Sequence, residues 1–241
     1  HILTRDLSYK NVFIVGFVCE GMKRKYSIYL FRHGQTTYNR DGRFTGQSEA
    51  KLTELGKKHA LKIARQLKDK TFEVAIHTRL SRSKDTLKPV LKGHPECKVI
   101  LEDDRMIERS YGELQGTTHE QFIDRIGKQS YDLRVHGDAI ENLEPKLRDK
   151  VEEFLGKEEY KAIHRGYRVA APGGESFKDV EKRVKSFIKD LKKFMRKNKV
   201  NVVISAHGNS IRLFRKIMER APKKAVVSWF IPYDKVFEYS V

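Results

Sequence analysis

The stretch Tyr29-Leu30-Phe31-Arg32-His33-Gly34-Gln35-Thr36-Thr37-Tyr38-Asn39 joins an apolar run to an Arg-His-Gly triplet and then to polar, turn-forming residues. Residues 27–31 have the length and residue types of a buried strand, and Gly34 allows the backbone to leave it sharply. Ligands of open α/β sheets lie at the carboxyl ends of strands. The pattern therefore predicts a strand that delivers His33, beside the permanent charge of Arg32, to a binding site.

A second strand-like run, at 201–206, ends in a similar motif, His207-Gly208-Asn209-Ser210, and passes into a helix-like segment at 211–219. Histidine and glycine therefore follow a predicted strand twice in this chain, which favours a site over a chance pair of loop histidines.

Two further charged residues follow predicted strands. Arg82 opens a helix-like segment that we expect to be interrupted near Pro89, and it comes after a strand predicted at 72–77. Glu108 comes just after the apolar run at 99–101. Together with the two histidine motifs, four strand ends present chemically active side chains.

These residue types suit phosphoryl transfer, which needs cations around the phosphate oxygens, a nucleophile and a proton donor for the leaving oxygen. Arg32 and Arg82 would each grip phosphate through two donors. His33 would attack phosphorus as a neutral imidazole and form a phosphohistidine, because its cationic neighbours lower its pKa. Glu108 would protonate the leaving oxygen and later activate water, and His207 would bind phosphate as a cation or a donor.

Five motifs in order make the chain resemble the histidine phosphatase superfamily, which includes the cofactor-dependent phosphoglycerate mutases. The resemblance extends from about residue 23 to residue 241. The motifs are LFRHGQTTYN, RFTGQSEAKLTELGKKHA, HTRLSRSKDT, ERSYGELQG and SAHGNSIR. A bare Arg-His-Gly triplet is a weak signal, whereas five such motifs in the same order are a specific one.

The resemblance implies the same roles that the residue types suggest. It makes His33 the nucleophile, Arg32 and Arg82 the phosphate arginines, Glu108 the acid and base, and His207 the second histidine. It also implies a set of substrate contacts, each of which has a plain structural alternative as a turn, packed or surface residue. These contacts are Asn39, Thr45, Gly46, Arg109, Tyr111 and Asn209.

The chain predicts one α/β domain, a three-layer sandwich in which helices flank a mostly parallel sheet, as in phosphoglycerate mutases. Residues 1–21 precede the resemblance and form a predicted N-terminal extension, so the domain covers 22–241. Residues 117–170 are polar and mostly helical in tendency, and we expect an insertion that acts as a lid. Gly173-Gly174-Glu175-Ser176 opens a clear amphipathic helix with Ser176 as its N-cap.

The composition fits a globular protein with a basic surface. The 241 residues carry a formal net charge of +18, with 39% hydrophobic and 34% charged residues. The basic residues are spread along helix-like segments, and no basic run is interleaved with aromatics as single-strand nucleic-acid binders require. The apolar stretch at 12–18 is too short to span a bilayer. We therefore expect a basic surface and neither a nucleic-acid nor a membrane partner.

Neither a metal site nor a disulfide is predicted. Cys19 and Cys97 are far apart and in no metal-ligand spacing, so a reducing cytoplasm is the expected location. A metal cation held by His33, His207 and a carboxylate would be opposed by the two arginines beside it. The other histidines carry no site pattern and are discounted as structural or surface residues: His59, His77, His94, His136 and His164.

The acceptor of the phosphoryl group separates two enzymatic hypotheses. The 99 positions between Glu108 and His207 resemble mutases. The chain, however, has Gly116-Thr117-Thr118-His119 where the mutases continue into a segment with a substrate-binding lysine, and Lys128-Gln129 where they carry paired arginines. We therefore favour a phosphatase for small phosphomonoesters without a cofactor. The alternatives are a phosphoglycerate mutase dependent on 2,3-bisphosphoglycerate and, less favoured, a non-catalytic basic module that binds nucleic acid; a homodimer stays open.

Overall fold

A five-stranded sheet forms the centre of the protein. The computed structural model describes residues 25–135 and 143–241, so the predicted extension at 1–21 and His136 lie outside the described residues. The strand order is β3-β2-β4-β1-β5, and β5 alone runs antiparallel to its neighbour. The strands are β1 (Ser27–Arg32), β2 (Val74–His77), β3 (Val99–Glu102), β4 (Val202–Ala206) and β5 (Val236–Ser240). The predicted mostly parallel sheet is confirmed.

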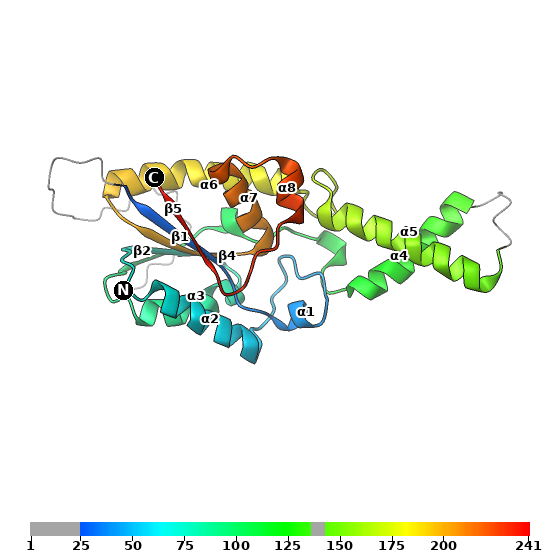
Figure 1. The fold of residues 1–241 in the computed structure, drawn as a ribbon, viewed down its shortest axis with the longest axis horizontal. Helices are drawn as coiled ribbons and strands as arrows, with labels where there is room; N and C mark the ends of the chain where they lie inside the picture. The colour runs from blue at the N-terminus through cyan, green and yellow to red at the C-terminus, as the bar shows by residue number, and fades with distance from the viewer. Residues whose placement is uncertain (1–24, 136–142) are drawn as a thin grey trace.

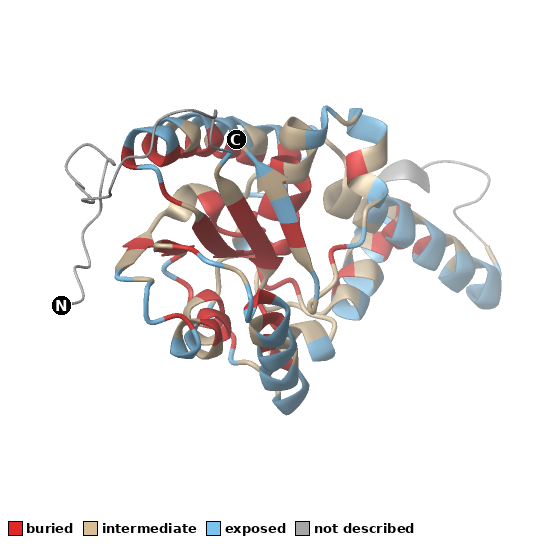
Figure 2. Cartoon of the chain, turned by 60° about the vertical axis from the view of Figure 1, so that its left-hand side comes forward, coloured by how far each residue is buried: buried red, intermediate tan, exposed pale blue. Residues whose placement is uncertain are grey.

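Helices cover both faces of this sheet (Figure 1). The helices α2 (Glu54–Leu67) and α3 (Ser81–Lys92) cover one face, and α6 (Phe177–Asn198) and α7 (Gly208–Glu219) cover the other. The alternation of β1 explains both layers, because Ile28 and Leu30 pack against α6 and α7, whereas Tyr29 and Phe31 pack against α2 and α3. The central strands β1, β2 and β4 are therefore buried on both sides (Figure 2), and the three-layer sandwich is confirmed.

The predicted start of α6 agrees with the structure, whereas the predicted interruption of α3 does not. Ser176 caps α6 as expected, and Asp179 completes a capping box by accepting a hydrogen bond from the Ser176 amide at 3.0 Å. The predicted interruption near Pro89 is wrong, because α3 continues through this residue to Lys92. Leu87 and Val90 are buried in the core on either side of the proline, and their packing outweighs the loss of one backbone hydrogen bond.

The segment predicted as an insertion forms a helical hairpin of α4 (His119–Val135) and α5 (Pro145–Arg165). The hairpin projects away from the sheet, and its base lies beside the carboxyl ends of the strands (Figure 1). The two helices approach closely, because a Cβ atom at Gly127 would stand 2.1 Å from the Glu152 carbonyl oxygen. Only the base of the hairpin therefore lies near the sheet, and the role of the segment as a lid stays a prediction.

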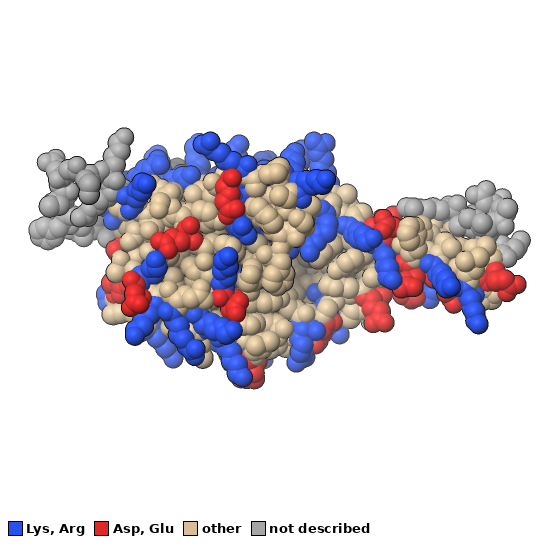
Figure 3. All heavy atoms as spheres, viewed as in Figure 1, with Lys and Arg blue, Asp and Glu red and all other residues tan. Residues whose placement is uncertain are grey.

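The remaining described elements are short: α1 (Thr37–Arg40), α8 (Lys223–Ser228) and 3-10 turns at Asp104–Met106 and Gly112–Leu114. Lys and Arg side chains are distributed over the face shown in Figure 3, with Asp and Glu between them. Across the described parts of the chain, no helix is both long and apolar enough to cross a membrane. The high charge is therefore spread over this face, as expected, and does not form a single stripe there.

Candidate active site

The register of two central strands places the two histidine motifs side by side. Arg32 of β1 pairs with Ala206 of β4, and the amide of His33 donates a hydrogen bond to the Ala206 carbonyl at 3.0 Å. His33 and His207 are the next residues of these parallel strands, so their side chains emerge at the same edge. Their ring centroids lie 5.1 Å apart.

The ring of His33 is held in one tautomer by its own backbone. Its Nδ1 lies 2.7 Å from the Gly34 carbonyl oxygen, which can only accept, so Nδ1 carries the proton and Nε2 keeps a lone pair. Burial lowers the pKa of His33 well below its ordinary value, and the charges of Arg82 and Arg32 lower it further. The lowered pKa was predicted, but burial contributes more than the arginines do. A neutral imidazole with a free Nε2 can act as a nucleophile.

Gly34 is required for a reason other than a sharp turn. A Cβ atom at this position would stand 2.2 Å from the Gly56 carbonyl oxygen, at the start of α2, so any side chain would push the helix away. The Gly34 amide also donates a hydrogen bond to Thr86 Oγ1 of α3 at 2.9 Å. The carbonyl that orients His33 is therefore fixed by packing against two helices.

Two arginines flank His33 and are held by neutral groups. Arg32 donates to the Ile231 carbonyl at 3.0 Å and lies 4.0 Å over the ring of Tyr233. Arg82 is fully buried and donates to the carbonyls of Gly46 and Ser48 at 2.6 and 2.7 Å. The Nε atoms of both guanidinium groups are buried without a hydrogen-bond partner. Both therefore keep full charge and spare donors for an anion.

His207 is the N-cap of α7 and is fully buried. Its Nε2 is 2.8 Å from the hydroxyl of Thr78, and its Nδ1 is buried without a partner. Burial lowers the pKa of His207 well below its ordinary value, and the charge of Arg82 lowers it further. Of the two roles predicted for His207, the geometry favours a neutral donor over a cation.

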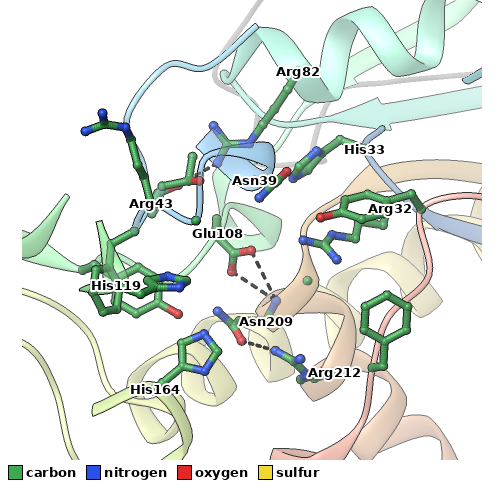
Figure 4. Close-up of a pocket in the computed structure, with 18 of the residues that line it drawn as sticks. Arg32, His33, Asn39, Arg43, Arg82, Glu108, His119, His164, Asn209 and Arg212 are labelled. Atoms are coloured by element: carbon green, nitrogen blue, oxygen red, sulfur yellow. Dashed lines mark hydrogen bonds between the residues drawn. The ribbon is translucent and has the colours of Figure 1, made fainter. Parts of the chain in front are cut away.

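Glu108 lies in the middle of the site (Figure 4). Its Oε1 accepts hydrogen bonds from the amides of Arg109 at 2.8 Å and Asn209 at 3.1 Å, whereas Oε2 has only the Asn209 amide at 3.4 Å. Arg183 and Gln47 donate to the backbone carbonyl of Glu108 at 3.1 and 3.2 Å and fix its position. The carboxylate is thus oriented, with Oε2 as its less engaged oxygen.

These groups surround one cavity of about 250 Å³. His207 is not a lining residue, but its ring centroid lies 5.1 Å from that of His33 and its Nδ1 has no partner. Arg109 does not line the cavity either, and its side chain is engaged elsewhere, stacked 4.4 Å over the ring of Tyr111 and bonded to the Ile163 carbonyl at 3.0 Å. The structure thus places Arg109 outside the cavity lining, although it was predicted to contact substrate. The predicted residues that do line the cavity are Arg32, His33, Asn39, Thr45, Gly46, Arg82, Glu108, Tyr111 and Asn209.

Several other lining residues were missed in the sequence. His164 was discounted there, yet it lines the cavity at the end of α5, and Arg212, one helical turn after Asn209, lines it from α7. The turn spacing could have indicated Arg212. Nothing local could have indicated His164, because its place depends on how the hairpin packs. The residues missed are Gly42, Arg43, Phe44, His119, His164, Arg165, Gly208, Arg212, Phe230 and Tyr233.

The cavity is strongly cationic, because five arginines and one carboxylate line it. In residues 25–135 and 143–241, no three His, Cys, Asp or Glu side chains are grouped so that they could hold a metal ion. The buried donors without partners include Arg32 Nε, Arg82 Nε, Thr45 Oγ1 and His207 Nδ1. Such donors around a free imidazole nitrogen suit a tetrahedral oxyanion.

The fold and this site define an enzyme that binds phosphate and transfers phosphoryl groups. The sequence model of the histidine phosphatase superfamily (branch 1) matches residues 28–144 and 138–236. The chain therefore belongs to this superfamily, whose enzymes include phosphoglycerate mutases and phosphatases.

Individual relatives carry both kinds of name. A 2,3-bisphosphoglycerate-dependent phosphoglycerate mutase of Neisseria meningitidis is 30% identical over 215 residues, covering 88% of this chain and 93% of the relative. A mycobacterial glucosyl-3-phosphoglycerate phosphatase has a similar structure, with a TM-score of 0.60 and 25% identity, covering 85% and 84% of the two chains. A phosphoglycerate mutase of Bacillus anthracis superposes with a TM-score of 0.66 at 21% identity, covering 90% and 88%.

Proposed function

We propose that this enzyme hydrolyses small phosphomonoesters through a phosphohistidine at His33. The observation that carries the proposal is the fixed tautomer of His33, whose Nδ1 donates to the Gly34 carbonyl at 2.7 Å while burial keeps the ring neutral. The reactive Nε2 is thereby free, and Arg32 and Arg82 flank it. A cavity of about 250 Å³ suits a small substrate.

The reaction follows from the positions of the groups. Nε2 of His33 attacks phosphorus, the bond to the leaving oxygen breaks, and Glu108 gives that oxygen a proton. Water then attacks the phosphohistidine while Glu108 takes its proton, which releases phosphate and restores the imidazole. Arg32 and Arg82 balance the charge on the oxygens during both steps, and Nδ1 of His207 donates to one of them.

The first test is the replacement of the nucleophile. His33→Ala should abolish phosphate release and acid-labile labelling of the protein, because it removes the Nε2 atom that would carry the phosphoryl group. His94→Ala is the matched control, since His94 is also buried but lies outside the cavity. Thermal unfolding of both variants checks the fold. Full activity of His33→Ala would overturn the proposal.

Phosphoglycerate mutase activity is the second candidate, favoured by the names of the relatives in the sequence comparison. In that case 2,3-bisphosphoglycerate would supply a phosphoryl group to His33, and Arg32 and Arg82 fit the phosphate that it would place there. The phosphatase is favoured because the segment after Glu108 lacks the lysine and the paired arginines that mutases carry there. The proposal therefore includes no cofactor.

One assay separates the two candidates. The enzyme is incubated with 3-phosphoglycerate and a trace of 2,3-bisphosphoglycerate, and both 2-phosphoglycerate and free phosphate are followed. A phosphatase releases phosphate without isomerisation. Rapid isomerisation with little phosphate would establish the mutase instead.

A further inference from the structure

The side of the cavity opposite His33 contains a second group of donors. Figure 4 shows Glu108 between two sets of side chains, with His33 and Arg82 on one side and His164 and Arg212 on the other. Arg165, the last residue of α5, also lines the cavity. A substrate phosphate beside His33 has its leaving oxygen at Glu108, so the rest of the substrate extends toward this second group.

Arg165 and Arg212 are cations without a compensating anion of their own. Arg165 has no hydrogen bond or ion pair with any residue that the structure describes, and its Nη1 is buried without a partner. Arg212 is only 9% exposed, and it donates to the Trp229 carbonyl at 2.8 Å and to the amide oxygen of Asn209 at 2.6 Å. Burial, followed by the charge of Arg165, lowers the pKa of Arg212 to about 10. An anionic ligand would relieve both effects.

The C-terminal end of α5, which borders the cavity, is fixed by contacts with neighbouring residues. Arg109 donates to the Ile163 carbonyl at 3.0 Å and is itself stacked 4.4 Å over Tyr111 and 4.8 Å over Phe177. The ring of His164 stacks nearly parallel to Tyr160 and Tyr111, with interplanar angles of 12° and 14°. His164 and Arg165 are therefore carried on a fixed helix end, as a preformed binding site requires.

We infer that Arg165, Arg212 and His164 form a second anion subsite, which selects phosphomonoesters that carry another anionic group on the leaving-group side. That group is a carboxylate or a second phosphate, because two guanidinium groups and an imidazole N–H bind either one. Selection by this subsite rests on the proposed function, since the scissile phosphate must lie at His33.

Binding in the His33→Ala background tests the subsite apart from turnover. Calorimetry compares 3-phosphoglycerate and 1,3-propanediol bisphosphate with glycerol 3-phosphate, which has a hydroxymethyl group in place of the carboxylate. At least one of the two ligands that carry a second anionic group should bind at least tenfold tighter than glycerol 3-phosphate. The ligand that binds more tightly identifies the second group as a carboxylate or a phosphate. Adding Arg165→Gln should reduce that preference at least tenfold. Lys161→Gln, an exposed change one turn earlier on α5, should leave it unchanged.

The outcomes separate the subsite from the function. The inference is overturned if no ligand is preferred over glycerol 3-phosphate, or if Arg165→Gln weakens all ligands equally, because Arg165 would then bind the scissile phosphate. Phosphate release by the unmodified enzyme from p-nitrophenyl phosphate, without any binding preference, would keep the function and reject the subsite. A lost preference in Arg165→Gln, with no phosphate release from any ester by the unmodified enzyme, would keep the subsite and reject the function.

Discussion

Replacing Glu108 by Gln should slow the enzyme in proportion to how much the leaving group needs a proton. Glutamine keeps the shape of the side chain, and its amide oxygen can accept the two amides now bonded to Oε1 at 2.8 and 3.1 Å. The change therefore removes the transferable proton at Oε2 with little change in packing. General acid catalysis contributes about 10²- to 10⁴-fold, or roughly 3 to 5 kcal/mol of barrier.

The assay compares kcat for glycerol 3-phosphate, whose leaving group is an alcohol that needs a proton, with kcat for p-nitrophenyl phosphate, whose leaving group departs readily as the p-nitrophenolate anion. We expect the full loss for the first substrate and less than about tenfold for the second. Glu113→Gln is the control, because Glu113 is exposed, lies five residues further along the chain and does not line the cavity. An equal loss for both esters in Glu108→Gln would show that Glu108 is not the acid.

Two further predictions concern the charge state and the support of the site. Tyr233→Leu should raise KM for p-nitrophenyl phosphate about 2- to 30-fold, because it removes the ring 4.0 Å under Arg32, whereas Tyr233→Phe should keep KM; equal values would exclude the stacking role. The folded state lowers the pKa of His33, His207 and His164, so the unfolded chain binds more protons than the folded chain below about pH 6.5. The free energy of unfolding therefore decreases as the pH is lowered through this range. Urea unfolding should show a loss of about 1.4 kcal/mol per histidine from pH 7.5 to 5.5, smaller by that amount in His164→Phe; an unchanged loss would contradict the assignment.

The sequence predicted the sheet and its active edge well, because the relevant signals are local. The apolar run before Arg32-His33 and the run before His207 each end where a strand ends, and parallel pairing then brings the two histidines together. The capping signal of Ser176 is likewise contained in four residues. The Pro89 prediction failed because burial on both sides of the proline is a property of the assembled core, which no short window contains.

The far side of the cavity could not be predicted for the same reason. His164 and Arg165 lie at the end of the helical hairpin. Their positions depend on the packing of α4 against α5 and on the hydrogen bond from Arg109 to the Ile163 carbonyl. The family resemblance implied a substrate contact for Arg109, but this side chain does not line the cavity. Its side chain bonds to the end of α5 and stacks on Tyr111 and Phe177, and these contacts depend on the assembled fold.

The way the arginines are anchored explains how a cavity can remain so cationic within a folded protein. A carboxylate partner would stabilise a buried guanidinium but would also cancel its charge. Arg32, Arg82 and Arg212 are instead bonded to backbone carbonyls, which orient each guanidinium, relieve part of its desolvation and leave the charge intact. Glu108, the single carboxylate of the lining, is engaged by two backbone amides rather than by an arginine, so it too stays available. Neutral anchoring thus keeps both the cations and the proton donor free for the phosphorylated substrate.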